Sequence, residues 1–207
     1  DGSEQWRTLV EGDGDHGRAL VDNLFVVAHS EELVALNQRN GDIVWRRPFE
    51  ESEPTGRNYS PELIAVDERS GIIVVPYRDG LKAFRAADGE PHWETAAVSQ
   101  QLLTPAIHDG IVYAVGQIDG KDSLAAFDLN DGTTRWTRAL ADPSTSADPV
   151  VTERGVFVVD ENTLRIHDRQ TGDRDSEIRL FEPGEMLSTT VAVDRGTAFV
   201  ATDEELL

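Results

Sequence analysis

The residues best suited to chemistry form a short acidic, glycine-rich loop near the N-terminus. Gly12, Gly14 and Gly17 have the GxGxxG spacing of a dinucleotide site, and Asp13 and Asp15 lie between them. Such a site needs a strand before the glycines and a helix after them, whereas a strand-like segment follows here, and the two carboxylates would repel a pyrophosphate. Two interpretations stay open: a metal ion held by Asp13, Asp15 and nearby carbonyls, or a solvated acidic loop, which we favour.

The other reactive side chains form no catalytic set. No Gly-x-Ser-x-Gly elbow is present, and the absence of cysteine excludes disulfides and thiolate chemistry. Residues 128–132 resemble a calcium loop, but they are one residue too short for the EF-hand spacing and lack the distal glutamate, so we interpret them as a turn. We predict no catalytic and no cofactor-binding residues. The histidines, which show neither HExxH nor an i, i+4 pair, are His16, His29, His92, His108 and His167.

A repeated pattern runs through the chain and determines where these residues lie. Each copy has a Leu, usually an Ala two residues later, a Gly eight residues after the Leu and a Trp four residues after the Gly. The fourth copy is degenerate, with Ile166 and Ser176 at the Ala and Trp positions. The constant twelve-residue offset between Leu and Trp indicates a structural repeat. The copies occupy residues 33–45, 81–93, 124–136 and 164–176.

Each copy predicts two antiparallel hairpins. The segment that starts at the Leu alternates like a strand, and the Gly supplies the positive φ that a tight turn needs before the Trp strand returns. A short strand, a turn such as Asp109-Gly110 and a β-branched strand precede each Leu. Such a four-stranded sheet cannot bury both faces alone, so the copies must stack radially. The β-branched strands are expected at 24–28, 72–77, 111–115, 156–160 and 197–201.

The sequence thus predicts an all-β fold, a β-propeller of four-stranded antiparallel blades with about five blades in this chain. Residues 1–6 match only the end of the unit, and residues 187–207 supply only its first three strands. In one interpretation the N-terminal strand completes the last blade of a closed propeller. In the other, the chain is a piece of a longer array. We expect residues 1–207 to form a single propeller domain.

The unit Leu-x-Ala-x-Asp-x-x-x-Gly-x-x-x-Trp, clearest at residues 124–136, resembles the PQQ-like (quinoprotein-type) propeller repeat. In that family, quinoprotein dehydrogenases hold PQQ and calcium on the propeller axis, whereas the scaffold propellers of outer-membrane assembly bind partners through loops without a cofactor. Active dehydrogenases have about eight blades, and many carry an adjacent-cysteine disulfide. The resemblance therefore implies a non-catalytic member, without PQQ or Ca²⁺, most like the uncharacterised extracellular members from halophiles.

The same resemblance implies a structural role for the aromatic residues of the repeat. In the family these tryptophans dock neighbouring blades, so Trp45, Trp93 and Trp136 are not expected to form a cofactor site. His167 takes the strand position that Leu36 has in the first copy, so we expect it in the core or between blades.

The charge balance restricts the class of partner and the environment. The 39 Asp and Glu residues exceed the 19 Lys and Arg residues, which gives a formal net charge of −20, and only Lys82 and Lys121 are lysines. This surface would repel phosphate backbones, so we predict no nucleic-acid partner. Acidic residues spread along the chain with few lysines are typical of extreme halophiles, where molar salt screens the repulsion. No apolar stretch is long enough to span a membrane.

These observations favour a non-catalytic scaffold at the cell surface of a halophile. Residues 50–60 form an insertion between two copies, and because loops carry specificity we expect a protein or surface-glycan partner to contact them. Ser176 makes the blades unequal, as a binding face requires, and the sequon at Asn58 agrees with export. The alternatives are a PQQ-dependent dehydrogenase-like redox protein and a carbohydrate-binding propeller, so enzyme activity stays open.

Overall fold

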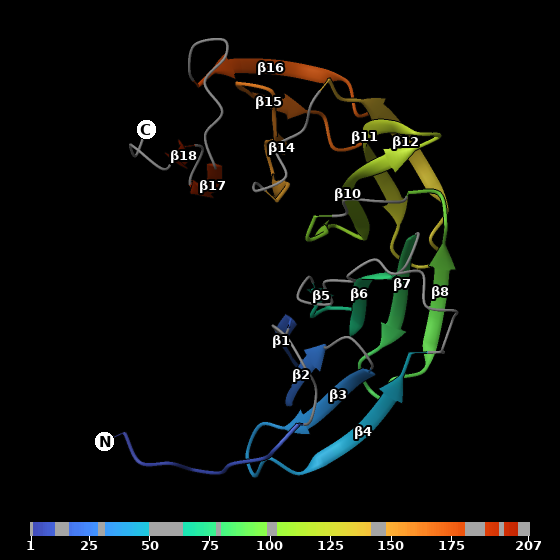
Figure 1. Ribbon diagram of the computed structural model, residues 1–207, viewed down its shortest axis with the longest axis vertical. Helices are drawn as coiled ribbons and strands as arrows, with labels where there is room; N and C mark the ends of the chain where they lie inside the picture. The colour runs from blue at the N-terminus through green and yellow to red at the C-terminus, as the bar shows by residue number, and fades with distance from the viewer. Residues whose placement is uncertain are drawn as a thin grey trace. The chain divides into compact units, whose positions relative to one another are not determined.

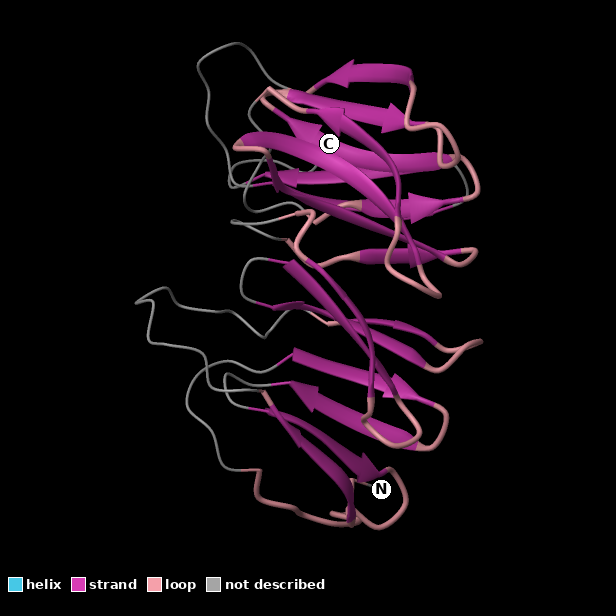
Figure 2. Cartoon of the chain, turned by 90° about the vertical axis from the view of Figure 1, so that its right-hand side faces the viewer, coloured by secondary structure: helices cyan, strands magenta, loops and turns pink. Residues whose placement is uncertain are grey.

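The structure is a computed structural model that describes residues 2–10, 17–28, 32–49, 64–77, 80–98, 103–141, 148–180, 189–194 and 197–202. Every regular element in these ranges is a β-strand (Figure 2). None of the described residues forms a helix of the length and apolar character that a membrane span requires. The chain divides into two compact units, unit 1 (Asp1–Glu94) and unit 2 (Thr95–Leu207).

Unit 1 contains two four-stranded sheets, each with its strands in chain order (Figure 1). The first sheet consists of β1 (Gly17–Val21), β2 (Leu24–Ala28), β3 (Glu32–Asn37) and β4 (Ile43–Pro48). The second sheet consists of β5 (Ala65–Asp67), β6 (Ile72–Tyr77), β7 (Gly80–Arg85) and β8 (Pro91–Thr95).

Unit 2 contains two further sheets of the same kind and one two-stranded sheet. The third sheet consists of β9 (Ala106–His108), β10 (Ile111–Ile118), β11 (Lys121–Asp128) and β12 (Thr134–Ala139). The fourth sheet consists of β13 (Val150–Thr152), β14 (Gly155–Asp160), β15 (Thr163–His167) and β16 (Arg174–Arg179). The fifth sheet consists of β17 (Thr189–Asp194) and β18 (Thr197–Thr202).

The predicted hairpins are present, and their turns have the backbone that the sequence requires. Gly41, Gly89, Gly132 and Gly172 have φ between 70° and 73°, a region that favours glycine. At the Asp109-Gly110 turn both residues have positive φ, as a type I′ hairpin demands. The strand that contains the repeat Leu also carries a β-bulge at one repeat position, which no sequence signal indicates. It lies at Ala35/Leu36, Ala126/Phe127 and Ile166/His167.

Two of the central strands, β3 and β14, are buried on both faces, which corrects the expected alternation. Leu33, Val34, Ala35 and Leu36 are all buried, and β14 is buried along its whole length. For β14 a neighbouring sheet covers each face, because Val156 packs in a core with the third sheet and Phe157 packs in a core with the fifth. In unit 1, one core cluster joins the first and second sheets, for example through Val26 and Ile73. The outer strands β4 and β16 are largely exposed.

Successive sheets of one unit contact each other through their first strands. In unit 1, β1 lies beside β5, and in unit 2, β13 lies beside both β9 and β17. Sheets that meet along their first strands and share cores between their faces have the arrangement of propeller blades. The all-β propeller prediction is therefore confirmed, whereas closure by the N-terminal strand and a single domain over residues 1–207 stay predictions.

Candidate functional site

At three places in the described structure a tryptophan packs on the glycine turn of the following copy, not on that of its own copy. A Cβ atom added at Gly89 would lie 2.6 Å from Cε3 of Trp45, and one added at Gly172 would lie 2.5 Å from Cε3 of Trp136. Trp6 of the N-terminal segment packs on Gly41 in the same way. The repeat position therefore requires glycine for two reasons: its φ is positive, and an indole ring occupies the space that a side chain would take.

Hydrogen bonds fix each indole ring at these junctions. Trp45 Nε1 donates to the Ala86 carbonyl at 2.8 Å, and Trp136 Nε1 donates to the Arg169 carbonyl at 3.0 Å. Arg47, two residues after Trp45, adds a hydrogen bond from Nε to the Gly89 carbonyl at 2.8 Å. Trp45 and Trp136 thus have the docking role that the family resemblance implied, and their indole N–H groups are satisfied by backbone.

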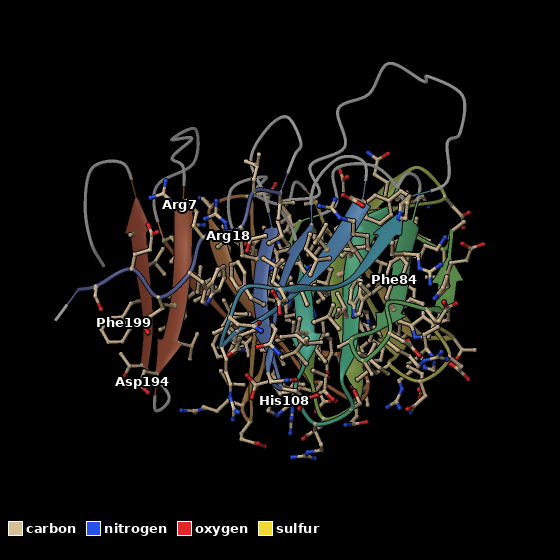
Figure 3. All side chains as sticks on the ribbon, turned by 90° about the horizontal axis from the view of Figure 1, so that it is seen from below. Arg7, Arg18, Phe84, His108, Asp194 and Phe199 are labelled. Atoms are coloured by element: carbon tan, nitrogen blue, oxygen red, sulfur yellow. The ribbon has the colours of Figure 1, made fainter. Side chains whose placement is uncertain are left out.

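The junction between the third and fourth sheets continues into a charged cluster at the turn ends of the strands. His108 ends β9, Asp109 follows it in the turn to β10, Glu153 lies in the turn from β13 to β14, and Arg169 lies in the turn from β15 to β16. Arg169 donates to Asp109 Oδ2 at 3.0 Å and to Glu153 Oε2 at 3.1 Å. We call these four residues the turn cluster. His108, labelled in Figure 3, lies at the lower edge of that view.

His108 contacts both acidic residues of the turn cluster. Its Nε2 atom lies 3.4 Å from Asp109 Oδ2 and 3.3 Å from Glu153 Oε1, and this nitrogen is buried without a hydrogen-bond partner. In the part of the chain that the structure describes, His108, Asp109 and Glu153 are the one set of three His, Asp or Glu residues whose ligand atoms converge, within 4.8 Å of one another. Among the described residues, these three side chains could therefore hold a metal ion.

The backbone beneath the turn cluster is held by buried aromatic residues. The Arg169 carbonyl accepts a second hydrogen bond, from the Tyr113 hydroxyl at 3.3 Å, and the Tyr113 and Trp136 rings lie 6.0 Å apart. Burial raises the pKa of Tyr113 to about 12, so this phenol remains a hydrogen-bond donor at neutral pH. The turn cluster therefore rests on a fixed backbone.

Two buried polar residues lie elsewhere in the fourth sheet. Asp160 is fully buried, accepts hydrogen bonds from the Ala141 N–H at 3.0 and 3.1 Å and pairs with Arg165. His167 is buried as predicted, with Nδ1 3.0 Å from the Gly172 carbonyl. Burial lowers the pKa of His167, so the neutral ring donates from Nδ1.

Several residues singled out in the sequence lie outside the described residues. These are Asp13 and Asp15, the 50–60 insertion and the sequon at Asn58. Residues 128–132 form the predicted hairpin turn: the Asp128 carboxylate accepts from the Asn130 N–H at 2.9 Å and from Arg135 at 2.6 Å. The hydrogen bond from Arg135 holds the pKa of Asp128 below its ordinary value.

The turn cluster was not predicted from the sequence. In the sequence, His108 is one of five scattered histidines and Asp109 is a turn residue. Neither Glu153 nor Arg169 belongs to a motif. Aligning the repeat copies could have indicated that Asp109 and Glu153 are neighbours, because both lie in the turn between the first two strands of consecutive units. Neighbouring sheets then bring their turns together.

Comparison with known proteins identifies the repeat. A family model described as "Outer membrane protein assembly factor BamB" matches residues 1–58 and 55–207. The chain is 27% identical over 176 residues to the outer membrane protein assembly factor BamB of Yersinia pestis, covering 78% of this chain and 42% of that protein. The corresponding protein of Shewanella oneidensis is 26% identical over 140 residues, covering 67% and 32%. The chain thus spans less than half the length of these curated relatives.

Solved structures show the same fold. BamB from Moraxella catarrhalis matches with a TM-score of 0.53 and 13% identity over 99% of this chain and 74% of that chain. Hsv2 of Kluyveromyces lactis matches with a TM-score of 0.68 and 11% identity over 93% and 66%. A europium-containing methanol dehydrogenase matches with 0.61 and 11% over 90% and 48%. The fold of these structures and the matching family model both agree with the repeat found in the sequence. The chain belongs to the BamB-like family of PQQ-type β-propeller repeat proteins.

Proposed function

We propose that this chain is a non-catalytic scaffold module that binds a protein partner through its loops. The observation that carries the proposal is the family match over residues 1–58 and 55–207 to proteins described as outer membrane protein assembly factors. The structure supports it, because the indole N–H groups of Trp6, Trp45 and Trp136 are bound by neighbouring backbone and are not available to a ligand.

The proposed setting is the outer surface of a cell, in high salt, with the outer-membrane protein assembly machinery as the class of partner. The membrane and the role are proposed because the relatives are named outer membrane protein assembly factors. The formal net charge of −20 supports the high-salt environment, because it destabilises a compact fold unless salt screens the repulsion. It also favours a partner whose contact surface is basic.

Site-specific photo-crosslinking in the native host tests this function. A photoreactive amino acid at Thr55, in the insertion expected to contact the partner, should give a discrete adduct with an outer-membrane protein assembly component, identified by mass spectrometry. The matched control carries the same group at Asp175, which is exposed on β16. The absence of an adduct at Thr55, or equal adducts at both positions, contradicts the proposal.

Two assays test the alternative functions. A redox protein would show a quinone spectrum and calcium-dependent dye reduction, and a carbohydrate-binding propeller would give selective signals on a glycan array. Dye reduction by the protein with added PQQ and Ca²⁺ would overturn the non-catalytic proposal. Selective glycan binding would replace the protein partner by a surface glycan.

A further inference from the structure

The turn cluster has the composition and position of a metal site. One imidazole and two carboxylates converge from the first turns of two neighbouring sheets in unit 2. The Asp109 and Glu153 side chains are 50% and 79% exposed, so an ion can reach them, whereas the His108 side chain is only 24% exposed. The buried His108 Nε2 has no hydrogen-bond partner, although it faces two carboxylates.

The distances fit a small tetrahedral ion. Zinc bonds of about 2.0–2.1 Å at tetrahedral angles separate two ligand atoms by about 3.3–3.4 Å. His108 Nε2 lies 3.4 Å from Asp109 Oδ2 and 3.3 Å from Glu153 Oε1, which matches two edges of such a tetrahedron. The third edge, between the two carboxylates, needs at most a modest side-chain adjustment, since all three atoms lie within 4.8 Å.

Arg169 hydrogen-bonds to both proposed carboxylate ligands without being a ligand itself. It binds Glu153 through Oε2, whereas Oε1 faces His108, so Glu153 can serve both groups at once. At Asp109 it contacts Oδ2, the atom that also faces His108, and the Oδ1 atom can take over the hydrogen bond. Such hydrogen bonds orient ligating carboxylates. The two carboxylates still outnumber the one guanidinium, so the site remains attractive to a cation.

We propose that His108, Asp109 and Glu153 bind a Zn²⁺ ion, with water in the fourth position. The nitrogen ligand favours zinc over Ca²⁺ and Mg²⁺, which prefer sets of oxygen atoms. The bound ion links the first turns of the third and fourth sheets and so strengthens their junction. This site is independent of the proposed scaffold function, because it requires no partner protein.

Isothermal titration of the full chain with ZnCl₂ at pH 7.5, in buffer freed of chelators, tests the site. One ion should bind per chain, and Co²⁺ in its place should give the visible absorption of a tetrahedral complex. His108→Ala and Glu153→Gln should each weaken Zn²⁺ binding at least about 10-fold. His92→Ala, which removes an exposed histidine of β8, is the control and should bind as the wild type does.

The result that overturns the proposal is wild-type Zn²⁺ binding that Glu153→Gln and His108→Ala leave unchanged, or no stoichiometric binding at all. Glu153→Gln decides the question even if His108→Ala fails to fold, because Glu153 is exposed and the substitution preserves its shape. Circular dichroism of each variant before titration establishes that it is folded.

Discussion

At the residue scale, the repeat glycine is the position where backbone and packing requirements meet. Gly89 has φ 70° and lies under the Trp45 ring, whereas Gly71 has φ 66° with open space where a side chain would go. The two glycines share the backbone requirement and differ only in the ring, so they form a matched pair.

Replacing each glycine with alanine separates the two requirements. Gly71→Ala should lower the free energy of unfolding by about 1–2 kcal/mol, the cost of a left-handed residue with a side chain. Gly89→Ala adds a steric clash worth about 1–3 kcal/mol and should cost about 2–5 kcal/mol in total. Denaturant unfolding of both variants measures the difference. Equal losses would show that the indole contact does not restrict this position.

His167 predicts a pH dependence of stability. Because burial lowers its pKa in the native state, the unfolded chain binds more protons near pH 6. Its contribution is fully present above pH 6.5, the ordinary value for His, and is lost as the pH falls through the lower native pKa. His167→Leu, with the residue of the equivalent position in β3, should make the unfolding free energy less sensitive to pH between 7.5 and 5. If wild type and variant lose stability in parallel, His167 is not the cause.

At the element scale, polar groups as well as rings join neighbouring sheets. Asp160 at the end of β14 accepts hydrogen bonds from the Ala141 N–H, just after β12, and pairs with Arg165 on β15. It therefore connects the third sheet to the fourth at the end of the strands opposite the turn cluster.

Asp160→Ala should be strongly destabilising, by about 3–5 kcal/mol, because it leaves the Arg165 charge and the Ala141 N–H without this buried partner. Asp175→Ala, at an exposed position of the outer strand β16, is the control and should change stability by less than about 0.5 kcal/mol. Denaturant midpoints of both variants measure the effects. A loss below about 1 kcal/mol for Asp160→Ala would mean that this carboxylate does not connect the sheets.

Much of the element order could be predicted because turn and strand signals recur at fixed offsets. The β-branched strands lie where they were expected; β2 and β6 match residue for residue, whereas β10 continues to Ile118. The short strands β5, β9 and β13 carry only three residues each, too few for a periodic pattern, so their bounds had to come from the structure.

The contacts between sheets could not be predicted in the same way. The spacing places Gly and Trp in one copy, but Trp45 docks on Gly89 of the next, and only stacking makes that pairing. The turn cluster depends on contacts such as Asp109 with Arg169, 60 residues apart, which no local motif encodes. The long-range part of the candidate site therefore follows from the order of the sheets.

At the scale of the whole molecule, the excess of acidic residues determines the response to salt. The formal net charge of −20 makes the acidic side chains repel one another. The Debye screening length, the distance over which this repulsion is felt, is about 10 Å at 0.1 M salt but only about 3 Å at 1 M. The melting temperature should therefore rise substantially between 0.1 M and 2 M KCl, measured by calorimetry. Sucrose at equal osmolality does not screen charge and should raise it less. A melting temperature that KCl leaves unchanged, or raises no more than sucrose does, would contradict the high-salt proposal.

A double-mutant cycle between Trp45 and Gly89 tests whether the tryptophan of one repeat holds the glycine turn of the next. In the wild-type background, Gly89→Ala should cost about 2–5 kcal/mol; in a Trp45→Leu background, the same change should cost only the backbone term of about 1–2 kcal/mol. Denaturant unfolding in 2 M KCl provides all four free energies. An equal cost of Gly89→Ala in both backgrounds would show that the two residues are not coupled and that the Trp45 ring does not hold this turn.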